Sequence, residues 1–138
     1  MVTDVINNRS ALNYFYKNIE IQGGNVELVK KYSYSTKYTF EIKAENDGFL
    51  ETLDAFKFGL GSMLIGAGRK NLTDKIDYSS GIRMNKKIGD PVKKDETIAE
   101  IFYNDKSCFS EAVNVINEGI KITSFKPLTN RIIYEIIE

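Results

Sequence analysis

Apolar residues near the N-terminus recur at the spacing of a helix. Four of them fall on one helical face: Leu12, Phe15, Tyr16 and Ile19. We expect this helix to have Ser10 as its N-cap and to stop at Gly23-Gly24. A second helix over residues 26–31 would pack back on the first through Val26 and Val29. Such a helical pair needs a further surface to cover its apolar stripe.

From Tyr32 onward the pattern changes to the two-residue alternation of strands. Tyr38, Phe40 and Ile42 alternate with polar residues, which predicts a half-buried strand. The turn residues Asn46-Asp47-Gly48 then lead the chain into a second strand over residues 49–53.

A helix is predicted next, over residues 55–65, with Asp54 as its N-cap. Gly59 and Gly61 lie inside this helix and lower its propensity, which indicates that another backbone packs closely against that face. The run Gly66-Ala67-Gly68 ends it.

Short strands with tight turns follow between residues 77 and 103. The last of them, over residues 97–103, carries Ile98 and Ile101, which cannot lie on the same face of a regular strand. We therefore expect a bulge or burial on both faces at this point.

An amphipathic helix over residues 107–119 and a strand-like tail over 131–137 complete the pattern. The order is two helices, then ββαβββα, then a last strand. This order predicts the α+β fold class.

The charges of the chain balance, with 19 Lys and Arg against 19 Asp and Glu in 138 residues. Nucleic-acid and anionic-membrane binders draw affinity from surplus positive charge, so we expect neither partner. No apolar run is long enough to cross a bilayer, and the N-terminus does not have the pattern of a signal peptide. These features predict a cytoplasmic protein.

Histidine is absent and Cys108 is the one cysteine. The usual nucleophile–base triads and zinc sites cannot be built from this chain alone, and no internal disulfide is available. We predict no catalytic residue, no metal ligand and no cofactor. Cys108 is expected to be a small packed or partly exposed thiol, and its role stays open.

The run Gly66-Ala67-Gly68-Arg69 has the composition of a phosphate-binding loop. Such loops lead into a helix N-terminus, whereas this run follows the predicted helix, so we interpret it as a C-cap. The lysine pairs 86-87 and 93-94 flank the turn at Gly89-Asp90-Pro91 and are expected to be solvated hairpin ends.

Two groups of carboxylates could be imagined as acid–base pairs: Asp95-Glu96 with Glu100, and Asp74 with Asp77. Acid–base pairs need a cleft that drives two pKa values apart. Both groups lie in turn-rich segments, so we expect surface charge.

Gly89-Asp90-x-Val92 followed by Ile98-Ala99-x-Ile101 resembles the barrel-sandwich motif of biotinyl and lipoyl carrier domains. Those carriers present a lysine on an exposed hairpin. The lysine here, Lys106, has no flanking hydrophobic residues and is followed by a predicted helix. We infer a shared architecture without the carrier function, and keep a free-standing interaction or carrier module as the alternative.

A larger set of segments, in one order and at close spacing, resembles the C-terminal domain of pyrimidine-nucleoside and thymidine phosphorylases. The segments are Gln22-Gly23-Gly24-Asn25, Asp47-Gly48-Phe49, Leu53-Asp54-Ala55, Met63-Leu64-Ile65-Gly66-Ala67-Gly68-Arg69, Asp74-x-Ile76-Asp77, Gly81-Ile82, Lys86-Lys87-Ile88-Gly89-Asp90-x-Val92 and Ala99-x-Ile101-x-Tyr103-Asn104. The chain departs from the family at Asp95, where glycine is usual, and at Ser79-Ser80, where Ala-Val is usual.

The resemblance implies an α/β-hammerhead (barrel-sandwich-like) domain over residues 32–138, preceded by a helical segment over 1–31 that links to an upstream part. It implies a parent enzyme that converts a pyrimidine nucleoside and phosphate to the free base and (deoxy)ribose 1-phosphate. The family's phosphate and base sites lie upstream, so phosphate and nucleoside bind only in the full enzyme, and this chain alone is predicted to be inactive.

The partner that the resemblance implies is therefore the remainder of the phosphorylase chain. Without it, Phe15 and Tyr16 would be partly uncovered, or covered by self-association. Arg69 and Lys87 are the residues expected to contact that remainder. The residues expected to set caps, turns and close backbone approaches are Asp47, Gly48, Asp54, Gly66, Gly68, Arg69, Asp77, Gly81, Gly89 and Asp90. The sequence leaves open whether the parent prefers thymidine or uridine.

Overall fold

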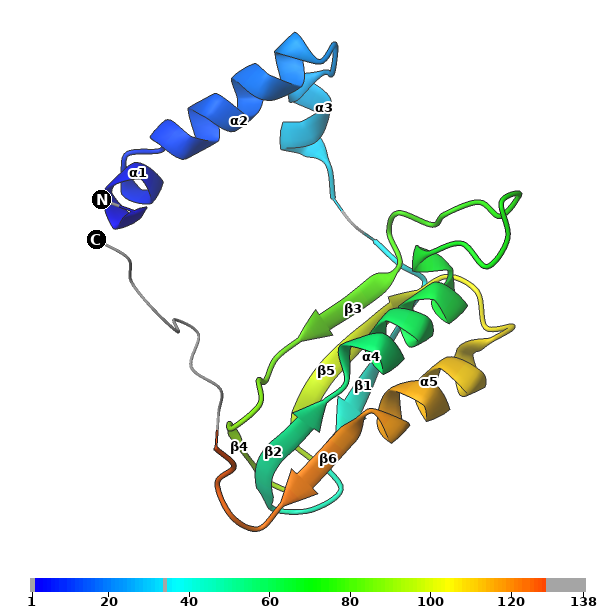
Figure 1. Ribbon diagram of the computed structural model, residues 1–138. Helices are drawn as coiled ribbons and strands as arrows, with labels where there is room; N and C mark the ends of the chain where they lie inside the picture. The colour runs from blue at the N-terminus through cyan, green and yellow to red at the C-terminus, as the bar shows by residue number, and fades with distance from the viewer. Residues whose placement is uncertain (1, 34, 129–138) are drawn as a thin grey trace. The chain divides into compact units, whose positions relative to one another are not determined.

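The computed structural model describes residues 2–33 and 35–128, in two compact units, Met1–Tyr34 and Ser35–Glu138 (Figure 1). Each unit is described by itself. The strand-like tail predicted at residues 131–137 lies outside the described residues.

The first unit consists of three helices, α1 (Val2–Asn7), α2 (Ser10–Ile21) and α3 (Val26–Lys31). The bounds of α3 are those predicted, and the Asn25 side chain caps it by accepting a hydrogen bond from the Leu28 amide at 3.2 Å. The helix α3 folds back on α2, where Lys30 Nζ lies 5.2 Å from the centre of the Tyr16 ring.

The start of α2 differs from the prediction. Ser10 is the first helical residue, and the N-cap is Arg9 in a left-handed conformation without a side-chain cap. The cause is α1, which the sequence pattern did not predict. It ends only two residues before α2, and the Asn8 side chain accepts the hydrogen bond of the Ser10 amide at 2.9 Å. Ser10 is therefore already held from the preceding turn.

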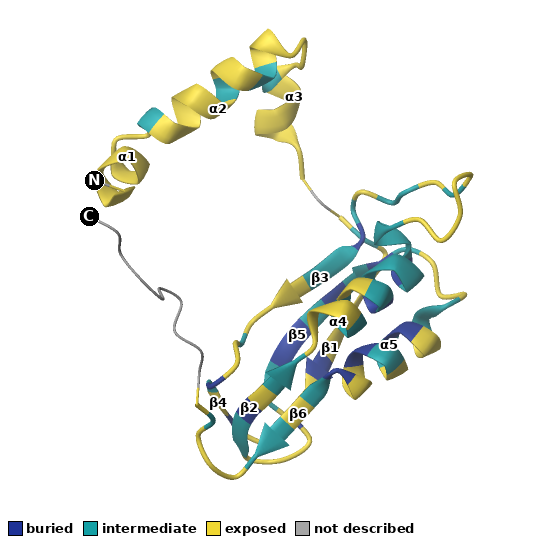
Figure 2. Cartoon of the chain, in the orientation of Figure 1, coloured by how far each residue is buried: buried dark blue, intermediate teal, exposed yellow. Residues whose placement is uncertain are grey.

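Within residues 2–33, no helix contains a buried residue (Figure 2). Phe15 is 52% exposed and Leu12 is 40% exposed, while Tyr16 and Ile19 are half-buried. The apolar stripe predicted for α2 is thus present and only partly covered within this unit.

The second unit contains two open antiparallel sheets of three strands each. The first has the order β1 (Tyr38–Lys43), β5 (Thr97–Tyr103), β3 (Gly81–Met84), and the second has the order β4 (Pro91–Val92), β2 (Gly48–Leu53), β6 (Ile120–Thr123). The turn at residues 46–48 therefore leads from one sheet to the other. The mixed helical and antiparallel-sheet content confirms the predicted α+β class.

The helices α4 (Ala55–Ser62) and α5 (Phe109–Glu118) lie on one face of the first sheet (Figure 1). Asp54 caps α4 as predicted, accepting the amides of Phe56 at 2.9 Å and Lys57 at 3.3 Å. A π-helical turn, Met63–Ala67, extends α4. The backbone leaves helical geometry at Gly66, whose φ of +96° suits glycine, and Gly68 is the C-cap. The run of glycines is a helix terminus, as predicted.

The irregularity predicted in β5 is present at Ile98. Ile42 pairs with Ala99 and Lys43 with Thr97, so Ile98 has no partner in β1. Both Ile98 and Ala99 are fully buried. Ile98 enters a cluster with Ala44, Leu50 and Val92, whereas Ala99 belongs to the other cluster, beneath α4 and α5. The bulge and the burial on both faces are confirmed.

The strand β6 was missed by the sequence pattern. It follows Gly119 directly after α5 and has only four residues. Ile120 and Ile122 alternate with polar residues, but such a short alternation is weak evidence without a visible partner. Its partner is β2, from which it is separated by more than 60 residues.

The two glycines inside α4 have different environments. A Cβ built on Gly61 would lie 2.5 Å from Ile116 Cγ1 and 3.3 Å from the Ala112 carbonyl oxygen, so α5 packs closely there. Nothing lies within 4 Å of such an atom on Gly59. The predicted close approach is confirmed for Gly61 and wrong for Gly59.

These environments predict opposite effects for two identical substitutions. Gly61→Ala should destabilise the chain by about 1–3 kcal/mol, because Ile116 and the α5 backbone must shift. Gly59→Ala, the matched control, should stabilise it by up to about 1 kcal/mol through helix propensity. Urea unfolding of both variants measures the difference. Equal stabilities would contradict the packing described for α4 and α5.

Candidate functional site

The Asp77 carboxylate is the centre of a polar cluster at one end of the first sheet. Its Oδ1 accepts hydrogen bonds from the Ser79 amide at 3.0 Å and the Ser79 hydroxyl at 2.6 Å. Its Oδ2 accepts from the Ser80 hydroxyl at 2.6 Å and from Asn104 Nδ2 at 2.7 Å. The hydroxyls of Ser79 and Ser80 and the amide of Asn104 hold the pKa of Asp77 well below its usual range.

This cluster joins four segments of the chain. The Asp77 amide donates to the Gly66 carbonyl at 2.8 Å, at the end of the π-helical turn. Asn104 follows β5, and its Oδ1 accepts the amide of Lys37, just before β1, at 2.8 Å. Asp77 was expected to be either a turn residue or surface charge. The four hydrogen bonds that its carboxylate accepts exclude a simple solvated charge.

The loop over residues 67–80 starts and ends at this cluster (Figure 1). Asp74 shapes the loop by accepting the amides of Lys70 at 3.0 Å and Asn71 at 2.8 Å, and these hydrogen bonds, that of Asn71 foremost, lower its pKa. Leu72 is 95% exposed, and Arg69 is exposed as well. A shaped loop thus displays an apolar side chain and a cation.

Cys108 is half-buried at the N-cap position of α5. Its Sγ lies 3.3 Å from Lys70 Nζ, which belongs to the same loop. The thiol is therefore partly exposed, as expected, and it is a neighbour of the loop.

Several predicted turn residues hold the opposite end of the unit. Asp47 Oδ1 accepts the Lys94 amide at 2.7 Å, and Asp90 Oδ2 accepts the Lys87 amide at 2.8 Å. Gly48 packs so tightly on the Thr123 carbonyl and Ile122 that no Cβ fits. Gly89 has a φ of +89° and donates to the Leu50 carbonyl at 2.8 Å.

At two of the predicted glycine positions, Gly68 and Gly81, the structure requires glycine to different degrees. A Cβ on Gly68 would lie 3.3 Å from Met63, a tight fit. Gly81 has neither a positive φ nor a neighbour within 4 Å of such an atom, so neither backbone freedom nor close packing requires glycine there. Asp95 stands at the position where the resemblance implies glycine, and it adopts a φ of +67°. Glycine adopts this left-handed conformation without strain, so the backbone here accounts for a glycine preference.

The lysines and carboxylates of the strands and turns pair with each other. Lys86 Nζ lies 2.5 Å from Glu96 Oε1, while Lys87 is exposed and forms no ion pair within the described part of the chain. Arg83 binds Glu100 and lowers its pKa. Glu96 and Glu100 therefore each have a cationic partner and do not form an acid–base pair with one another.

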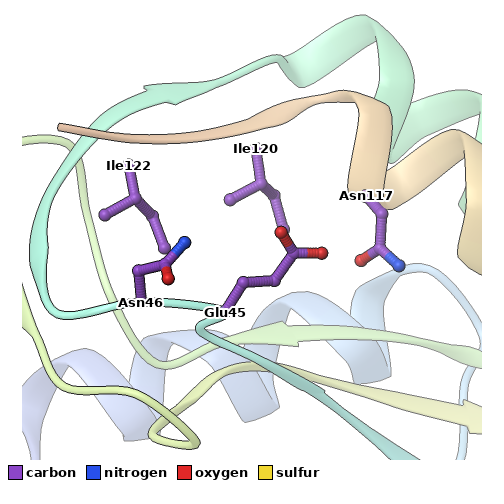
Figure 3. Close-up of a pocket in the computed structure, with 5 residues that line it drawn as sticks. All are labelled: Glu45, Asn46, Asn117, Ile120 and Ile122. Atoms are coloured by element: carbon purple, nitrogen blue, oxygen red, sulfur yellow. The ribbon is translucent and has the colours of Figure 1, made fainter.

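A small pocket lies where the turn after β1 approaches the end of α5 and β6 (Figure 3). Its volume is about 160 Å³, and five residues line it: Glu45, Asn46, Asn117, Ile120 and Ile122. None of these residues was predicted as a site residue, and Asn46 was named only as a turn residue, because the lining comes from two segments about 70 positions apart.

Metal-binding clusters and membrane-spanning helices were searched for over residues 2–33 and 35–128. Within these ranges, no three His, Cys, Asp or Glu side chains gather in a way that could hold a metal ion. No helix there is both long enough and apolar enough to cross a membrane.

Comparison with known proteins gives a consistent result. The family model for the pyrimidine nucleoside phosphorylase C-terminal domain matches residues 49–123. The chain belongs to this family. The matched region contains both sheets except β1, both helices of the second unit, and the Asp77 cluster.

Individual members of the family agree with the match. The chain is 35% identical to a pyrimidine-nucleoside phosphorylase of Staphylococcus haemolyticus over 99% of its own length and 32% of the relative's. It is 38% identical to a thymidine phosphorylase of Metamycoplasma hominis over 91% of its own length and 47% of the relative's. A phosphorylase of Geobacillus stearothermophilus is 30% identical over 98% of this chain and 31% of its own. The chain thus spans a third to a half of the length of these relatives.

The Asp77 cluster predicts a pH-dependent loss of stability. Asp77→Asn should lower the free energy of unfolding by about 1–3 kcal/mol at pH 7. The substitution replaces one carboxylate oxygen by an NH2 group, which cannot accept the hydrogen bonds that the neighbouring groups donate. A carboxylate with a lowered pKa in the folded state stabilises that state above its unfolded pKa, and this contribution is lost as the pH falls toward the folded value. The difference in unfolding free energy between the wild-type chain and the variant should therefore be constant from about pH 7 to 5 and narrow below about pH 4.

Glu51→Gln is the control, since Glu51 is exposed and its side chain forms no hydrogen bond or ion pair among residues 2–33 and 35–128. Urea unfolding at several pH values gives both differences. A gap between wild type and Asp77→Asn that stays constant down to pH 3 would contradict the assignment.

Proposed function

We propose that this chain acts as the noncatalytic C-terminal domain of a pyrimidine-nucleoside phosphorylase. The parent enzyme would convert a pyrimidine nucleoside and phosphate to the free base and (deoxy)ribose 1-phosphate. The observation that carries the proposal is the match of nearly the whole chain to about a third of such an enzyme. The lack of histidine supports inactivity of the chain alone.

The role that fits this domain is to complete and brace the larger enzyme. The two hydrophobic clusters of the second unit both contain residues of β5. The Asp77 cluster fixes both ends of the loop at residues 67–80. Such a rigid body suits a scaffold beside an active site that closes by domain motion. We extend the proposal to a hammerhead (barrel-sandwich-like) arrangement of the second unit and to a cytoplasmic enzyme.

The division proposed for this role is a linking segment over residues 1–31 and the C-terminal domain over 32–138. The partly exposed stripe of α2, including Phe15, supports contact with the upstream part of the enzyme or with a second copy. Arg69 and Lys87 are the proposed polar contacts, because both are exposed and form no ion pair among the described residues.

The experiment mixes this chain with the Staphylococcus haemolyticus phosphorylase from which the matching segment has been deleted. Neither protein alone should cleave thymidine or uridine in the presence of phosphate, and the mixture should do so, because the missing domain is restored. Release of the free base, followed by absorbance, measures the result. Turnover by the pure chain alone would refute the predicted inactivity, and a mixture that binds but stays inactive would refute the bracing role.

The same assay tests the two proposed contacts. Arg69→Ala and Lys87→Ala should each weaken assembly about two- to fivefold without changing stability, as expected for exposed ion pairs. Lys75→Ala and Lys94→Ala, exposed neighbours in the same loop and turn region, serve as controls. Equal effects of all four variants would show that only overall charge matters for assembly, and would refute specific contacts by Arg69 and Lys87.

A further inference from the structure

The pocket between the β1–β2 turn and the end of α5 presents unpaired polar groups. The side chains of Glu45, Asn46 and Asn117 form no hydrogen bond or ion pair among residues 2–33 and 35–128. All three are exposed, so a ligand from solvent reaches them. Figure 3 shows the Glu45 carboxylate reaching toward Ile120 from the turn below, with Asn117 beside it.

The electrostatics of the pocket favour a cation. The Glu45 carboxylate is the charged group of the lining, and carboxamide oxygens are available from both asparagines. Asn117 lies in the last turn of α5, where the helix dipole is negative and the helix itself has no basic residue. The adjacent Glu118 is already paired with Lys57 at 2.6 Å.

The shape of the pocket limits the size and nature of the guest. Its volume of about 160 Å³ is below the roughly 300–1,000 Å³ of drug-sized sites, so a nucleoside does not fit. The carboxylate repels phosphate. A metal ion is disfavoured, because Ca²⁺ and Mg²⁺ sites provide more oxygen ligands than the single carboxylate of this pocket. Half-buried Ile120 and Ile122 form an apolar wall on which a short aliphatic stem can lie.

The turn that carries the carboxylate is fixed on both sides. The Ala44 amide donates to the Glu96 carbonyl at 2.9 Å, and the Ala44 carbonyl accepts from the Asp95 amide at 2.8 Å. Asp47 is held to the Lys94 amide at 2.7 Å. Glu45 and Asn46 thus project from a backbone that needs little ordering when a ligand binds.

We propose that this pocket binds a guanidinium or primary ammonium group carried on a short aliphatic stem. The Glu45 carboxylate pairs with the cation, the asparagine oxygens accept its remaining hydrogen bonds, and the isoleucines cover the stem. The group is either an arginine or lysine side chain of an associated protein segment or a free alkylamine.

The test is a titration of the isotope-labelled chain with n-butylguanidinium and with n-butylammonium, followed by amide NMR shifts. Both cations should shift the amides of the five lining residues saturably, with a dissociation constant on the order of 1–10 mM. The neutral analogue n-butanol should not. Glu45→Gln should weaken binding about five- to tenfold, whereas Glu51→Gln, an exposed glutamate on β2, should leave it unchanged.

Absence of saturable shifts with both cations would overturn the proposal, and so would equal binding of n-butanol or of the Glu45→Gln variant. These outcomes do not depend on the phosphorylase assignment, because the isolated chain is used. Repeating the titration on the chain assembled with the deleted phosphorylase identifies the source of the group. If the assembled chain no longer binds the added cations, a side chain of the partner occupies the pocket. If it binds them as before, the natural ligand is a free amine.

Discussion

Burial of β5 on both of its faces is the constraint on which the second unit depends. Two consecutive residues, Ile98 and Ala99, are fully buried in different clusters, because successive side chains of a strand point to opposite faces. This central strand therefore supports the helices α4 and α5 in one cluster and the sheet of β2, β4 and β6 in the other. The bulge at Ile98 shifts the register of β5 against β1 within this stretch. The two sheets cannot move independently without exposing one of these side chains.

This shared strand gives the unit two fixed ends. At one end, Asn104, which comes directly after β5, donates a hydrogen bond to the Asp77 carboxylate. The Asp77 cluster in turn fixes the base of the loop at residues 67–80. At the other end, Ala44 is bonded to the turn that precedes β5 and sets the position of Glu45. Both surfaces that we propose as contact sites are therefore positioned by backbone that the core holds. This arrangement is what a noncatalytic domain needs if it is to brace a larger enzyme, because a brace transmits position through a rigid body.

The sequence predicted most features that depend on neighbouring residues. The bounds of α3 and β1, the Asp54 cap and the glycine terminus at Gly66 all follow from local propensity and capping. A bulge or burial on both faces of β5 was also expected, because two isoleucines three residues apart cannot share a strand face. Features that depend on distant residues were missed. Pairing of β6 with β2, the bonds of Asp77 to Asn104 and the pocket at Glu45 join segments far apart in the chain. Ser79 and Ser80 were noted only as departures from the family, although their hydroxyls are what complete the Asp77 cluster.

If the domain docks through preformed surfaces, its core stays unchanged on assembly. Amide hydrogen exchange distinguishes docking at the surface from rearrangement of the core, when it is measured by mass spectrometry on the chain alone and after mixing with the deleted Staphylococcus haemolyticus phosphorylase. We expect slower exchange at residues 69–79 in the mixture and unchanged exchange in β5, whose amides are already protected by the core. Exchange that is the same in both samples throughout residues 35–128, or protection that appears first in β5, would contradict docking of this kind.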